Sequence, residues 1–80
     1  MPLVFRFDGF RFHIYSNEGD PREPIHIHVT RACADAKFWL FPEVEMAYNR
    51  GFDARTIRRL LDIVTNHRGE IEEAWHEYFG

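Results

Sequence analysis

The chain has 80 residues, of which 45% are hydrophobic and 16% aromatic, with a net charge of −3 at neutral pH. This length predicts a single domain over residues 1–80, and the hydrophobic content excludes a disordered chain. No stretch approaches the roughly 18 apolar residues of a membrane span, and the N-terminus lacks the pattern of a secretory signal. The single cysteine, Cys33, excludes an internal disulfide framework and is typical of a protein from the reducing cytoplasm.

Charge is distributed unevenly along the chain. Residues 1–59 hold nine Lys or Arg against eight Asp or Glu, whereas residues 60–80 hold one Arg against five Asp or Glu. The C-terminal part is therefore acidic, and the first part is mildly basic and aromatic. The net charge of the whole chain argues against nucleic-acid binding, but the charge of the first 59 residues does not.

Two strands, 3–7 and 10–15, flank Asp8-Gly9, a dipeptide that strongly favours a two-residue hairpin turn. With this turn, the facing residues are Phe7 and Phe10, Arg6 and Arg11, Phe5 and Phe12, and Val4 and His13. Alternation then places one set of side chains on a single face, namely Leu3, Phe5, Phe7, Phe10, Phe12 and Ile14. This apolar face is the predicted core.

Residues 16–24 have the composition of a loop, which Pro24 closes. Three further strands are predicted. The strand 25–31 places Ile25, Ile27 and Val29 on one side and His26, His28 and Thr30 on the other. After a turn at 32–35, the strand 36–41 places Phe38 and Leu40 inward and Lys37, Trp39 and Phe41 outward. A short fifth strand is predicted at 44–49, where Val44, Met46 and Tyr48 alternate, with a helical turn as the alternative.

Helix follows the strands. Asp53 is a favourable N-cap, and Phe52 and Ile57 have the spacing of a hydrophobic staple. The apolar positions then recur with helical period at Leu60, Leu61, Val64, Ile71, Ala74, Trp75 and Tyr78. Gly69 interrupts this stripe, so one kinked helix and two consecutive helices are both compatible with it, and Asn66 or His67 is a candidate cap for a second segment. The predicted fold class is α+β, an antiparallel sheet of four to five strands packed on one face by C-terminal helix.

The other face of the predicted sheet is cationic and aromatic. Its candidate functional residues are Arg6, Arg11, His13, Tyr15, His26, His28, Lys37 and Trp39. Two histidines separated by one residue on a strand point to the same side, with Cα atoms roughly 6.5–7 Å apart. Such a pair suits acid–base cleavage of RNA without a metal, because imidazole titrates near neutral pH.

In this hypothesis His26 and His28 are the catalytic pair, and the cationic side chains contact phosphate. Tyr15 and Trp39 would stack on unpaired bases. No cofactor is required.

Three other interpretations compete with this one. A metal site would need His13, or a carboxylate from residues 18–23, as a third ligand, but the neighbouring Arg and Lys side chains disfavour a divalent cation, so no metal is predicted. The residues can also be polar side chains without a function on the open side of a sheet. The remaining alternative is a non-catalytic binding module whose sheet face or edge docks a small partner protein.

Five stretches resemble a known bacterial family called domain of unknown function 4160. They read YSNEG at 15–19, PIHIHV at 24–29, AKFWL at 36–40, NRGF at 49–52 and AWHEYF at 74–79. The resemblance implies a type II toxin–antitoxin module in which a protein like this one is the toxin. It also implies a small antitoxin-like partner, often of the domain of unknown function 2442 type. The resulting expectation is a cytoplasmic toxin that acts on RNA.

Overall fold

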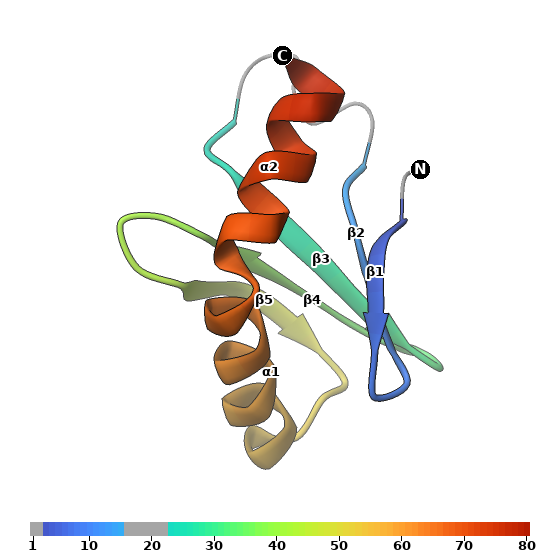
Figure 1. Ribbon diagram of the computed structural model, residues 1–80. Helices are drawn as coiled ribbons and strands as arrows, with labels where there is room; N and C mark the ends of the chain where they lie inside the picture. The colour runs from blue at the N-terminus through green and yellow to red at the C-terminus, as the bar shows by residue number, and fades with distance from the viewer. Residues whose placement is uncertain (1–2, 16–22) are drawn as a thin grey trace.

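The chain folds into five strands followed by two helices, as a computed structural model describes it for residues 3–15 and 23–80. Each strand pairs antiparallel with the next in the order β1-β2-β3-β4-β5 (Figure 1). The strands are Leu3–Phe7 (β1), Phe10–His13 (β2), His26–Arg31 (β3), Ala34–Trp39 (β4) and Glu45–Arg50 (β5), and the helices are Ala54–Asn66 (α1) and Arg68–Phe79 (α2). The predicted α+β class is therefore confirmed. Most of the predicted loop 16–24 lies outside the described residues.

The first hairpin turns at Asp8-Gly9, as predicted. Both residues have positive φ, 53° for Asp8 and 85° for Gly9, which is what a two-residue hairpin turn requires. The next pairs are also those expected, namely Phe7 with Phe10, Arg6 with Arg11, and Phe5 with Phe12. The predicted pairing of Val4 with His13 is wrong, because a one-residue irregularity at Val4 places Leu3 opposite His13.

This irregularity changes which side chains of β1 reach the core. Val4 packs against the core, whereas Leu3 is 42% exposed. Phe7 is 43% exposed, because it lies beside the turn at the end of the strand. The prediction that Leu3 and Phe7 belong to the core is therefore wrong, while Phe10 and Phe12 are fully buried.

The fifth strand is present, so the alternative of a helical turn is wrong. A second one-residue irregularity lies at Ala47, since Tyr48 is opposite Lys37 whereas Met46 is opposite Phe38. Tyr48 and Met46 thus lie on opposite faces of the sheet, not on the same face as their spacing predicts. Both edge strands, β1 and β5, carry such an irregularity.

Helix α1 begins as the sequence predicts. The Asp53 carboxylate accepts a hydrogen bond from the Thr56 backbone N–H at 2.8 Å, and this bond lowers the pKa of Asp53. The side chain of Asn49 hydrogen-bonds to both the N–H and the carbonyl of Phe52, at 3.1 and 2.9 Å. Phe52 is buried and Ile57 packs against the core, which is consistent with the predicted staple.

The helical stripe divides into two helices at His67, which is the residue between them. Its Nδ1–H donates to the Ile63 carbonyl at 2.8 Å, and its ring stacks on Phe5 with centroids 4.5 Å apart. His67 therefore ties the end of α1 to the first hairpin, and its side chain does not cap α2. Tyr78, predicted to lie in the helical core stripe, is 46% exposed.

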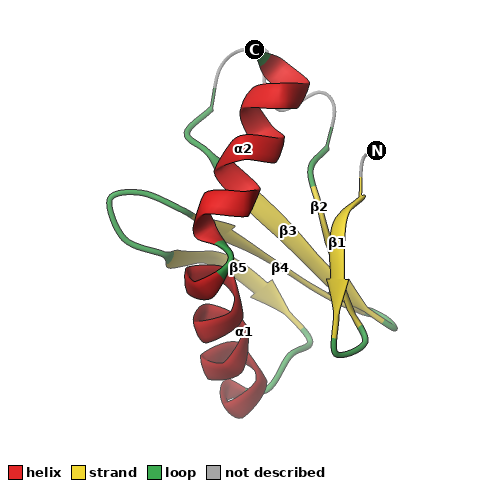
Figure 2. Ribbon diagram, in the orientation of Figure 1, coloured by secondary structure: helices red, strands yellow, loops and turns green. Residues whose placement is uncertain are grey.

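The two helices run end to end along one side of the sheet (Figure 2). The buried residues of the helices and of the facing strands form one cluster. Its members are Phe10, Phe12, Ile14, Ile27, Val29, Ala36, Phe38, Leu40, Phe52, Leu60, Ile63, Val64, Ile71 and Trp75. The opposite face of the sheet, called the helix-free face below, holds the candidate functional residues, although Trp75 of α2 also contacts one of them, His26.

Candidate functional site

Rows of paired side chains cross the helix-free face from strand to strand. The row nearest the Asp8-Gly9 turn consists of Arg6, Arg11, Thr30, Asp35 and Arg50. The next row consists of Leu3, His13, His28, Lys37 and Tyr48. In the third, Trp39 lies between His26 and Glu45. The pairing therefore brings together the residues that the sequence assigns to this face. Tyr15, just after β2, joins them, and its ring centroid lies 4.1 Å from that of His28.

The three histidines of this face are buried, although the sequence predicts an open surface. His13, His26 and His28 are 5%, 0% and 3% exposed. Histidine titrates and transfers protons usefully only where a substrate can approach its ring nitrogens. The prediction that the three histidines face solvent is therefore wrong.

His26 is enclosed from several sides. Its ring makes edge contacts with Trp39 of β4, with a centroid distance of 5.4 Å, and with Trp75 of α2, at 4.9 Å. Its Nδ1–H donates to the Pro24 carbonyl at 2.8 Å, because a carbonyl oxygen can only accept. The contact with α2 explains why alternation could not predict this burial, since α2 passes over the beginning of β3.

His28 belongs to a cluster with His13 and two tyrosines. The His13 and His28 rings are roughly parallel, with centroids 6.1 Å apart. The Tyr48 hydroxyl lies 3.4 Å from His28 Nδ1, and the His28 tautomer decides which group donates. His13 Nε2 lies 3.3 Å from the Thr30 hydroxyl. The cluster is a packed polar–aromatic layer.

The two rings of the proposed acid–base pair contact each other and are shielded from solvent. The His26 and His28 rings stand at 87° to each other with centroids 5.2 Å apart. This separation leaves no room for a phosphate group between the rings. In this conformation the pair therefore does not have the geometry of a bracketed scissile phosphate.

Lys37 is already engaged by its neighbours. Its Nζ lies 3.1 Å from Glu23 Oε1 and 4.4 Å from the centroid of the Trp39 ring, and its side chain is 13% exposed. The ion pair reduces the positive charge that Lys37 offers to a ligand, and the cation covers the face of Trp39 that a base would need. The predicted contact of Lys37 with phosphate and the predicted stacking on Trp39 both require these contacts to break.

Arg6 and Arg11 differ from Lys37 because they are exposed and directly opposite each other. Within the part of the chain that the structure describes, neither makes an ion pair. Like charges on directly opposed residues of a sheet are destabilising. The fold therefore keeps two adjacent guanidinium groups available at a small cost in stability.

Tyr48 is a member of this site that sequence reasoning missed. Burial raises the pKa of its hydroxyl, and the negative charge of the neighbouring Asp35 raises it further. The spacing of residues 44–49 places Tyr48 with Met46, and only the irregularity at Ala47 shows that it faces Lys37. The signal in the sequence is the alternation of Val44, Met46 and Tyr48. It predicts that Tyr48 shares a face with Met46, which is wrong.

We expect Tyr48 to make the protein less stable in strong alkali. A group whose pKa is raised on folding contributes stability that is present below its unfolded pKa, near 10, and is lost as the pH rises through its folded pKa. Between pH 9 and pH 11 the midpoint of urea unfolding should therefore fall more for the native chain than for Tyr48→Phe. An equal fall in both proteins would contradict this assignment.

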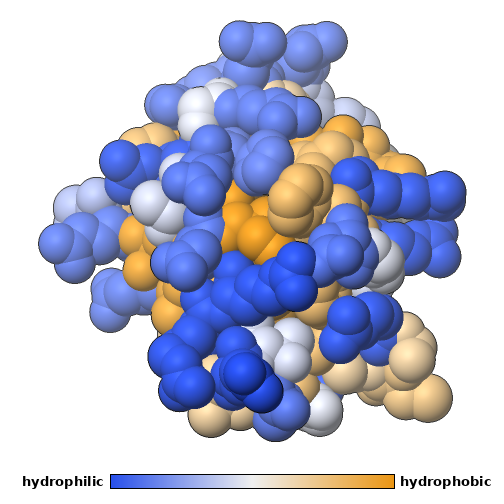
Figure 3. All heavy atoms as spheres, turned by 60° about the horizontal axis from the view of Figure 1, so that its bottom comes forward, coloured by the Kyte–Doolittle hydropathy of each residue, from blue (hydrophilic) through white to orange (hydrophobic). Residues whose placement is uncertain are grey.

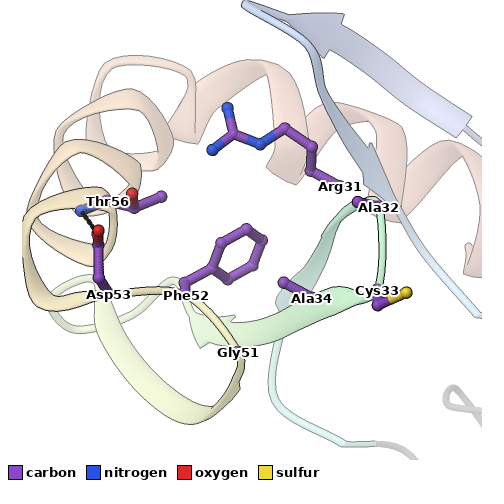
Figure 4. A pocket seen from close by; sticks show the side chains of 8 residues that line it. All are labelled: Arg31, Ala32, Cys33, Ala34, Gly51, Phe52, Asp53 and Thr56. Carbon is purple, nitrogen blue, oxygen red and sulfur yellow. Dashed lines mark hydrogen bonds between the residues drawn. The ribbon is translucent and has the colours of Figure 1, made fainter.

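A separate hollow of about 420 Å³ lies where the β3–β4 turn meets the start of α1 (Figure 4). Arg31 and Phe52 line it, while the exposed Cys33 thiol points outward. Asp53 also lines the hollow, but its carboxylate is engaged as the N-cap of α1. The hollow is away from the histidines and holds no group with an evident chemical task.

Within residues 3–15 and 23–80, no three His, Cys, Asp or Glu side chains are arranged to hold a metal ion. The carboxylates considered as third ligands, at positions 18–23, lie mostly outside this range. Neither described helix is both long and apolar enough to cross a membrane.

Comparison with known proteins identifies a family but no characterised relative. No curated protein and no solved structure matches the chain. The model of one family, described as "Domain of unknown function (DUF4160)", matches residues 9–76. This match includes β2 to β5 and most of α2, and so contains both the histidine cluster and Arg11. The chain therefore belongs to the DUF4160 family.

Proposed function

We propose that this protein is the toxin of a bacterial type II toxin–antitoxin pair and that it acts in the cytoplasm by binding RNA. Membership of the family supports the toxin role through the sequence resemblance described above. The exposed Arg6 and Arg11 beside an aromatic cluster support RNA as the target.

The observation that carries the mode of action is the burial of His26 and His28. A protein that cleaves RNA with this pair must present both ring nitrogens to the substrate. The two rings are instead packed between aromatic side chains, with His26 hydrogen-bonded to the backbone. We therefore infer that the histidines belong to the packed layer beneath the binding surface and that the protein binds RNA without cleaving it.

The partner in this proposal is a small antitoxin-like protein of the domain of unknown function 2442 type. Both edge strands carry one-residue irregularities, at Val4 and Ala47. Such irregularities disfavour pairing of an edge with another chain. Docking of the partner on a face of the molecule is thus better supported than extension of the sheet.

The proposal is tested by expressing the chain in a bacterial host with and without the product of the neighbouring reading frame. We expect growth inhibition that the neighbour relieves, and purified protein that binds RNA but leaves it intact. The glutamine variant His28→Gln, which keeps a polar side chain of similar size, should inhibit growth as the native chain does.

Two results would contradict the proposal. Cleavage of RNA by the native chain that is lost in a folded His28→Gln variant would restore the acid–base hypothesis. Absence of both growth inhibition and RNA binding would remove the toxin role and the RNA target together.

A further inference from the structure

We infer that a single-stranded RNA segment binds across the turn end of the helix-free face, with a phosphate at Arg6 and Arg11 and one unstacked base beside Tyr15. This inference rests on the proposed RNA target, and it names the surface and the form of the RNA.

The first support is the charge around the Asp8-Gly9 turn. Arg6 and Arg11 lie on the helix-free face, and on the other face Arg31 approaches Gly9, while Arg59 forms an ion pair with Asp8. Figure 3 shows the end of the molecule that comes forward from the bottom of Figure 1, where hydrophilic side chains surround a small hydrophobic area. The ion pair of Arg59 with Asp8 cancels one charge of each sign, so Arg6 and Arg11 are the cations that attract an anion to the helix-free side of this turn.

The second support is the shape of the surface on either side of Arg11. One hollow of about 450 Å³ lies at the turn and is lined by both Arg6 and Arg11. Another, of about 200 Å³, is lined by Leu3, Arg11, His13, Tyr15 and Thr30. Arg11 lines both hollows, so the two hollows adjoin the same residue and can be occupied by neighbouring parts of one bound chain.

The chemistry of the two hollows favours RNA over an acidic protein segment. Guanidinium groups bind phosphate oxygens through paired, geometrically matched hydrogen bonds. The smaller hollow lies below the roughly 300–1,000 Å³ of typical ligand pockets, and its aromatic wall suits one planar ring. Carboxylates form the same paired hydrogen bonds, but a nucleotide supplies a phosphate and an aromatic ring in one unit, whereas an acidic side chain supplies no ring. Bases are available for such stacking in single strands and are not in a duplex.

The test uses the full chain and a fluorescein-labelled ten-nucleotide oligouridine, with affinity measured by anisotropy between 50 and 200 mM salt. We expect Arg6→Gln and Arg11→Gln each to weaken binding by about tenfold and to reduce the salt dependence by roughly 0.7 in log–log slope. Arg58→Gln removes the same charge from an exposed position on α1 and is the matched control. It should change neither quantity appreciably.

A second arm tests the base. Tyr15→Leu should weaken binding by about tenfold without changing the salt dependence, because stacking carries no charge. Tyr15→Phe retains the ring and should bind as the native chain does. A duplex RNA of equal length should bind more weakly than the single strand.

The outcomes distinguish failure of the inference from failure of the proposed function. If the native chain binds the oligonucleotide but Arg6→Gln and Arg11→Gln behave like Arg58→Gln, the surface is wrong and the RNA target stands. Equal affinity for duplex and single strand would overturn the assignment of an unstacked base. If the native chain binds polyglutamate and no RNA, an acidic protein replaces RNA, and the RNA target falls as well.

Discussion

Replacing His26 with alanine is expected to lower the free energy of unfolding by about 3 kcal/mol. The His26 ring is fully buried between Trp39 and Trp75, and its Nδ1–H satisfies the Pro24 carbonyl. Alanine leaves a cavity lined by both indoles and removes the donor to that carbonyl. A chain of 80 residues has a total stability of only about 4–12 kcal/mol, so this loss is a large fraction of the whole.

Urea unfolding followed by circular dichroism measures this loss. His76→Ala is the control, because His76 lies on the exposed side of α2 and its variant should change stability by less than about 0.5 kcal/mol. A His26→Ala protein with native stability would show that the ring is not needed for packing. The structural assignment of His26 would then be wrong, and a direct role in chemistry would have to be reconsidered.

Replacing Phe12 with alanine is expected to cost about 4 kcal/mol of stability. Phe12 is 0% exposed, its ring stacks on Phe5 with centroids 4.4 Å apart, and it makes an edge contact with the Phe10 ring, with centroids 6.4 Å apart. The variant empties a site on the central face of the core, where the sheet meets the helices. Its thermal unfolding midpoint should fall far enough to leave part of the population unfolded at 37 °C.

Phe7→Ala is the matched control for Phe12→Ala. Both phenylalanines belong to the same hairpin and the same predicted core face, but Phe7 is 43% exposed. Its replacement should cost less than about 1.5 kcal/mol, since much of its surface is already in water. Similar losses for both variants would mean that the helices cover the turn end more completely than the structure describes.

The local elements could be predicted where short-range chemistry decides them. Asp8-Gly9 specifies a tight turn because both residues tolerate positive φ, and Asp53 begins a helix because its carboxylate satisfies a free backbone N–H. The first three pairs of the hairpin follow from the turn by counting. The five-stranded α+β arrangement follows in turn from the alternating strands and the C-terminal helical stripe.

Strand alternation gives wrong predictions where a strand contains a one-residue irregularity. One extra residue at Val4 and another at Ala47 reverse the facing of Leu3 and Met46 relative to the expected alternation. Nothing local to these positions marks them, since valine and alanine are ordinary strand residues. Both irregularities are on edge strands, which lack a second neighbour that would enforce strict pairing.

The sequence by itself determined the fold class, the first turn, the start of α1 and most of the residues that gather on one face of the sheet. Tertiary structure decided which of them are accessible. His26 is buried because α2 brings Trp75 against it, and Lys37 is engaged because Glu23 reaches it. These contacts join segments far apart in the chain, so no local periodicity contains them. Arg6 and Arg11 stay exposed at the turn, and for that reason the proposed binding surface lies there.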